Sequence, residues 1–142
     1  RGNTRLRLKL GELNNMSLNI QSVTALTLVA PSTRTATVTG TGVDLSPYVN
    51  TVNTNLKIVA DVGTVTGTTP TLDITVEESD SSGSGYTAIT GAAFTQITAT
   101  GTGAVEIHTK TNKRYIRAVG TIGGTTPSFP LAIWALVIER YT

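Results

Sequence analysis

The chain has 142 residues, a length typical of one domain that can bury a sizeable core. It contains no cysteine, which excludes disulfides and thiolate metal sites, and its longest apolar run falls well short of the roughly 18 residues that a membrane helix needs. Charged residues make up only 14% of the chain while threonine fills 28 of the 142 positions, a composition that favours strands and a weakly charged surface suited to contact with other proteins.

The net charge of +2 is unevenly distributed. Residues 1–10 carry four basic side chains and no acid (+4), and the remainder carries seven basic and nine acidic side chains (−2). Six residues within this segment alternate between cation and leucine: Arg5, Leu6, Arg7, Leu8, Lys9 and Leu10. In a strand, this alternation places the cations on one face and the leucines on the other. Because such a segment cannot cover its own leucines, we interpret residues 1–15 as an N-terminal arm whose six alternating residues form an interface.

The body, residues 16–142, begins with strand-like segments. Residues 18–30 read as a strand that Pro31 closes, and residues 33–39 read as a second, shorter strand. Residues 43–49 indicate a turn or an edge, because Pro47 has no N–H to donate to a ladder.

Two clearly alternating strands are expected next, at residues 56–62 and 71–77. Their predicted inward side chains are Leu56, Ile58, Ala60 and Val62 in the first strand and Leu72, Ile74 and Val76 in the second. Residues 79–85 (SDSSGSG) indicate a polar turn, and short strands are expected around residues 86–90 and 94–99.

The last third of the chain indicates three strands. They cover residues 104–109, 114–122 and 129–139, with a turn at residues 110–113 between the first two. No amphipathic helix is evident. Many short strands separated by Gly, Pro, Asn and Ser turns predict an all-β fold, an antiparallel β-sandwich or jelly roll with an extended N-terminal arm.

Trp134 lies in the apolar run LAIWALVI, residues 131–138, which does not alternate cleanly. We therefore expect both faces of this strand to be covered, one by the core of the domain. The cover of the other face is open between a neighbouring subunit, a terminal arm and the rest of the same chain. Trp134 and Tyr141 are accordingly further candidate interface residues.

One eleven-residue segment occurs twice. Residues 62–72 read VGTVTGTTPTL, residues 119–129 read VGTIGGTTPSF, and seven of the eleven positions are identical. Each copy joins one apolar strand to the next through Gly-Thr-Thr-Pro, in which Gly permits positive φ and Pro fixes the entry to the next strand. We interpret the copies as equivalent hairpins or equivalent crossovers between two sheets. A pair of equivalent binding loops is the alternative.

Residues suited to catalysis are sparse. His108 is the only histidine, it is expected to face outward with Glu106, and the chain lacks both cysteine and a G-x-S-x-G nucleophile motif. The acidic stretch at residues 77–80 lacks the spacing of a calcium loop and reads as a solvated hairpin tip. We therefore expect no enzyme activity, no metal and no cofactor.

Two basic clusters raise the question of nucleic acid. The arm could neutralise phosphates, and a weaker cluster comprises Lys110, Lys113, Arg114 and Arg117 with Tyr115. Because the body is slightly acidic and shows no basic face studded with aromatic residues, we do not expect nucleic-acid binding. We expect no membrane association either.

Several segments between residues 43 and 130 resemble small structural proteins of tailed bacteriophages, and in particular head decoration (cement) proteins. These segments read VDLSPYV, LKIVADVGTVTGTTPTLDITVEESD, YTAIT, FTQIT and KRYIRAVGTIGGTTPSF. The resemblance implies a homotrimer that sits on the major capsid protein outside the mature head and stabilises it against the pressure of packed DNA. It also implies a virion location after assembly in the host cytoplasm. The decoration proteins have no catalytic residues, so the resemblance assigns none to this chain.

Two other functions remain open. The first is a tail, baseplate or connector component of the virion. The second is a carbohydrate-binding β-sandwich module, whose aromatic platforms would be Tyr48, Tyr86, Tyr115 and Tyr141.

Overall fold

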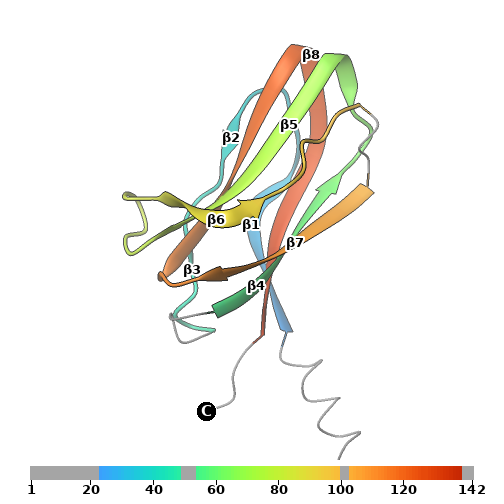
Figure 1. Ribbon diagram of the computed structural model, residues 1–142. Coiled ribbons are helices and arrows are strands. Elements are labelled where there is room, and N and C mark those ends of the chain that lie inside the picture. The colour runs from blue at the N-terminus through green and yellow to red at the C-terminus, as the bar shows by residue number, and fades with distance from the viewer. Residues whose placement is uncertain (1–22, 49–53, 100–102, 139–142) are drawn as a thin grey trace, which may run out of the picture.

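The computed structural model describes residues 23–48, 54–99 and 103–138 (Figure 1). The regular secondary structure in these ranges consists of β-strands alone, and all pairings between strands are antiparallel. The predicted all-β, sandwich-like fold is confirmed. The predicted arm, residues 1–15, and Tyr141 lie outside the described residues. No helix in the described ranges is long and apolar enough to cross a membrane.

In the part of the chain that the structure describes, eight strands form two sheets that share one long strand. They are β1 (Val23–Arg34), β2 (Val38–Thr39), β3 (Val43–Asp44), β4 (Thr54–Val62), β5 (Thr66–Ser79), β6 (Thr87–Ala93), β7 (Gly103–Thr111) and β8 (Tyr115–Ile138). The C-terminal half of β8 lies between β1 and β4, and β7 follows β4; we call this sheet A. The N-terminal half of β8 pairs with β2, β3 and β5, and β6 follows β5; we call this sheet B.

The core lies between the two sheets and follows the predicted alternation. All the inward side chains predicted for residues 56–62 and 71–77 are buried. The second half of β8 contributes a third buried row: Phe129, Leu131, Ile133, Ala135 and Val137. Burying one large apolar side chain contributes about 1.5–3 kcal/mol, so these rows are the main source of stability.

The prediction that Pro31 closes the first strand was wrong, because β1 continues to Arg34. The pairing of β1 with β8 shifts register between Val29 and Ser32, on either side of Pro31. A proline is tolerated at such an irregularity because no ladder hydrogen bond depends on its missing N–H. Of the strand predicted at residues 33–39, only Val38–Thr39 remains separate, as β2.

Two further predictions need correction. Residues 114–122 and 129–139 were expected to be separate strands, but residues 115–138 form the single 24-residue strand β8. Residues 94–99 are not a strand. They run beside β5 through an isolated bridge, in which Leu72 N donates to Ile97 O at 2.8 Å and Ile97 N donates to Leu72 O at 2.9 Å.

The two copies of the repeat lie side by side. Thr68 in the first copy is the pairing partner of Thr125 in the second. The first copy takes the chain from β4 in sheet A to β5 in sheet B, and the second takes β8 from sheet B to sheet A. The interpretation as equivalent crossovers between two sheets is therefore confirmed, and both copies belong to the junction of the sheets (Figure 1).

Candidate interaction surfaces

Trp134 lies on the outer face of sheet A. Its neighbours Ile133 and Ala135 are buried in the core, and side chains alternate along a strand, so the indole points away from the core and is half-buried. The register places Thr27 of β1 and Val59 of β4 directly beside it. The expected core cover of residues 131–138 is present, because Leu131, Ile133, Ala135 and Val137 are buried. Trp134 and Leu136, on the other face, are half-buried, and a cover on that face stays a prediction.

Apolar side chains continue on this face towards the end of the sheet. Leu136 lies between Ala25 of β1 and Lys57 of β4, and Val23, at the start of β1, is 43% exposed. We call the apolar surface formed by Val23, Ala25, Val59, Trp134 and Leu136 the outer patch. Exposed apolar patches on a folded domain mark interaction surfaces, since water-facing sheet faces are normally polar.

A hollow of about 300 Å³ lies at the end of the outer patch. Its lining combines apolar, polar and charged side chains: Val23, Asn55, Leu56, Lys57, His108, Thr109 and Leu136. An apolar floor with a polar border is the usual composition of a protein–protein contact.

A small charge cluster forms the border of the outer patch on β7. Lys57 Nζ lies 2.6 Å from Glu106 Oε2, and His108 Nε2 lies 3.8 Å from Glu106 Oε1. The hydrogen bond from Lys57 is the main cause that lowers the pKa of Glu106. Since these side chains are exposed, water and salt screen the interactions among them, and the cluster adds little to the stability of the fold.

On the outer face of sheet B, an ion pair and an aromatic ring hold the polar turn that precedes β6. Arg117 Nε donates to Glu77 Oε2 at 2.7 Å, and the Arg117 guanidinium lies 4.1 Å from the centre of the Tyr86 ring. The Tyr86 hydroxyl donates to Ser82 O at 2.9 Å, and burial raises the pKa of that phenol. Tyr86 is therefore engaged in internal contacts and is not an open platform for a sugar.

Two more basic residues of the weak cluster, Arg114 and Lys113, also have internal partners. Arg114 binds Asp44 through two hydrogen bonds, Nε to Oδ1 at 3.0 Å and Nη2 to Oδ2 at 2.7 Å. Lys113 Nζ lies 3.3 Å from Asp80 Oδ2. These pairings neutralise cations that a nucleic-acid surface would need to keep available.

The acidic residues near the turn act as internal acceptors. Glu78 accepts hydrogen bonds from Thr111 Oγ1 at 2.6 Å and from Asn112 N at 3.0 Å. Thr111 is fully buried, so this carboxylate satisfies a hydroxyl that would otherwise lack water. Among the described residues, no three His, Asp or Glu side chains gather in a way that could hold a metal ion.

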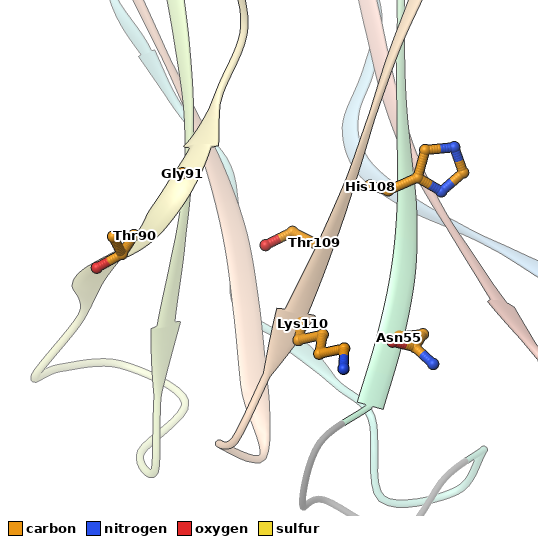
Figure 2. Close-up of a pocket in the computed structure, with 6 residues that line it drawn as sticks. All are labelled: Asn55, Thr90, Gly91, His108, Thr109 and Lys110. Carbon is orange, nitrogen blue, oxygen red and sulfur yellow. The ribbon is translucent and has the colours of Figure 1, made fainter.

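A second surface, which no sequence pattern indicated, lies where β6 and β7 approach each other without pairing. Hollows of about 450 Å³ and about 330 Å³ lie along it. Figure 2 shows Thr90 and Gly91 on β6 and Thr109 of β7 pointing towards β6. The next side chain, His108, points from the opposite face of β7, away from β6. We call this surface the β6–β7 seam. Only strand order could reveal it, because neither strand has an unusual sequence.

The comparisons with known proteins concern the fold. No protein-family model matches the chain, and no curated protein does so. Among solved structures, the chain is similar to the crystal structure of PBSX exported protein XepA, with a TM-score of 0.51 and 19% sequence identity. The match covers 84% of this chain but only 38% of that chain, so this chain spans less than half the length of the structure it resembles. At this identity the two chains share a fold.

Proposed function

We propose that the protein is a structural component of a bacteriophage particle. Within that class, we propose that it is a head decoration protein that binds the outside of the mature capsid and stabilises it against internal DNA pressure. The fold similarity to XepA, a phage protein, supports the general class. The resemblance of the segments between residues 43 and 130 to decoration proteins supports the narrower role.

The observation that carries this proposal is the outer patch centred on Trp134. A decoration protein acts by covering area on another protein, and a stable contact buries about 1,000 Å² or more in total. An apolar sheet face with a charged border supplies such a contact, with the large aromatic ring as its anchor. Many weak copies on one shell would add up, because each copy stabilises the same lattice.

Trp134 is also the reporter for the test, because it is the only tryptophan in the chain. We would add the full-length protein to mature capsids and to unexpanded precursor capsids of the same phage. Co-sedimentation with mature capsids and a blue shift of the tryptophan emission on binding are the expected results. A protein that stays in the supernatant with both capsid forms would overturn the decoration role.

Two variants separate the outer patch from the rest of the surface. Leu136→Ser removes an apolar side chain beside Trp134 and should weaken co-sedimentation. Thr75→Ser changes a side chain on sheet B, in the strand pair β5–β8, and should leave it unchanged. Equal binding by both variants would show that the capsid contact lies elsewhere.

We propose a homotrimer as the assembly state, and light scattering on the purified protein tests it. A trimer agrees with the decoration role, whereas a ring of six would favour the tail, baseplate or connector alternative. The carbohydrate alternative has less support in the geometry. Tyr86 contacts Arg117, Tyr48 packs against the core, and the Arg114 guanidinium lies 5.1 Å from the centre of the Tyr115 ring.

A further inference from the structure

The strand β7 presents an edge that is well suited to accept another strand. It pairs with β4 in unbroken register from Thr54↔Thr111 to Val62↔Gly103. Within the described residues, no strand pairs with its other edge. Its nine residues contain no proline and no bulge, and alternate N–H and C=O groups along such an edge point outward. An edge of this kind is a template for strand addition.

The opposite wall of the β6–β7 seam is not an equivalent template. The pairing of β6 with β5 shifts register between Thr75↔Ala93 and Glu77↔Ala88. Gly91, within the shifted part, has a φ of +78°. A bulge twists an edge away from regular pairing, and native sheets use bulges to block strand addition. A strand entering the seam would therefore pair with β7.

The seam also leaves part of the core uncovered. Val105, on the inner face of β7, is 38% exposed, and Ile107 and Ile89 are only partly buried although they pack against the core. The hollow of about 330 Å³ is lined by Val105 and Ile107 together with Phe94 and their neighbours. A strand with an apolar side chain at every second position would cover these residues.

We propose that residues 5–10 of the chain's own N-terminal arm pair with the outer edge of β7 and close the β6–β7 seam. Leu6, Leu8 and Leu10 would enter the seam and cover the exposed part of the core. The cations at residues 5, 7 and 9 would point to the outer face, which is open to water and where β7 carries Glu106, His108 and Lys110. The strict alternation of the arm matches a site that is apolar inside and open to water outside.

The chain leaves the described structure at the correct end for this contact. Val23 pairs with Ile138, and Leu56 pairs with both Val137 and Thr109, so the start of β1 and the end of β7 lie at the same end of sheet A. From β1 to β7 there are three strand spacings, about 14 Å. The twelve residues between Leu10 and Val23 can span roughly 40 Å when extended, which is enough to cross the sheet. Tethering makes the arm of the same chain the favoured occupant, since its effective concentration is high.

Hydrogen exchange of the full-length protein provides the first test. Replacing Leu6, Leu8 and Leu10 by serine should speed the exchange of β7 amides by about tenfold or more, because the edge would lose its cover. Replacing the cations Arg5, Arg7 and Lys9 by serine is the matched control and should change β7 much less. Exchange in the centres of β5 and β8 should be the same in all proteins, which verifies that the body is folded. Unchanged β7 protection in the leucine variant would overturn the proposal.

Because the chain has no cysteine, engineered disulfides provide a second test that keeps every leucine but one. Leu8→Cys combined with Val105→Cys, or with Ile107→Cys to allow for register, should oxidise to a disulfide within one chain. Arg7→Cys with the same partners is the control, since alternation turns residue 7 to the other face. The expected product migrates as a monomer under non-reducing conditions.

Two results would overturn the proposal. Disulfides that form only between chains would assign the edge of β7 to a second copy. Equal disulfide formation by residue 8 and residue 7 would show that the arm does not pair with this edge. The capsid-binding test does not bear on it.

Discussion

Gly67 and Gly124 occupy equivalent positions in the two copies of the repeat, and each lies against the backbone of the other copy. A Cβ atom on Gly67 would lie 2.8 Å from Thr126 O, and one on Gly124 would lie 2.6 Å from Thr69 O. The two threonines are also equivalent to each other and share an unusual positive φ, 47° and 48°. The crossover of the two sheets is therefore a locally two-fold symmetric junction, in which each copy of the motif is the packing partner of the other.

The junction predicts matched effects of two substitutions. Gly67→Ala and Gly124→Ala should each lower the free energy of unfolding by about 3 kcal/mol or more, because both combine a positive φ with a backbone overlap. Gly91→Ala is the control: its φ is positive, but a Cβ there would meet no atom within 4 Å, so a loss of about 1 kcal/mol is expected. Denaturant unfolding followed by tryptophan fluorescence measures all three. Similar losses for Gly67→Ala and Gly91→Ala would contradict the packing argument.

The Asp44–Arg114 pair predicts a pH dependence of stability. The two hydrogen bonds from Arg114 hold the pKa of the Asp44 carboxyl well below its ordinary value of 3.8. The contribution of the pair is therefore complete above pH 3.8, and it is lost as the pH falls towards the lowered pKa, because the unfolded chain takes up a proton first. Asp44→Asn should be less stable than the wild type at neutral pH, and the difference should shrink in acid. Asp61→Asn, on the exposed face of β4, is the control, and a constant difference for Asp44→Asn would contradict this account.

Substitutions on the two faces of β8 should lower the free energy of unfolding by different amounts. Ile133→Ala empties a fully buried site and should lower the free energy of unfolding by about 3 kcal/mol. Leu136→Ala, on the outer patch, should lower it by less than about 1.5 kcal/mol, since that side chain is only half-buried in the single chain. Thermal unfolding of dilute protein compares the two. A larger loss for Leu136→Ala would mean that the outer face is already covered within the monomer.

The Arg117–Glu77 pair predicts a coupling energy. Arg117→Met leaves the half-buried Glu77 carboxylate without its partner and removes the contact with Tyr86, so a loss of about 1–3 kcal/mol is expected. Glu77→Gln in the same background should restore part of that loss, because the orphaned charge is gone. A double-mutant cycle by denaturant unfolding gives the coupling, and strictly additive effects would show that the ion pair contributes nothing.

Local patterns in the sequence were sufficient to predict most strands and their buried faces. In residues 56–62 and 71–77 every second side chain is apolar, and period-two alternation identifies the inward face without knowledge of any partner. The outward position of His108 followed from the same reasoning. Gly-Thr-Thr-Pro predicted a pair of equivalent hairpins or crossovers, because Gly permits positive φ and Pro fixes φ locally.

Contacts between distant segments decided the rest. Gly123-Gly124-Thr125-Thr126-Pro127 reads as a turn, yet it stays within β8 because β5, carrying the other copy of the motif, pairs with it. Pro31 reads as a strand end, yet a register shift with β8 accommodates it. Strand order alone made β6 an edge strand of sheet B and β7 an edge strand of sheet A, and so created the seam between them. Alternation and turn chemistry act within a few residues, whereas pairing depends on which segments meet across the chain, and only the folded structure determines that.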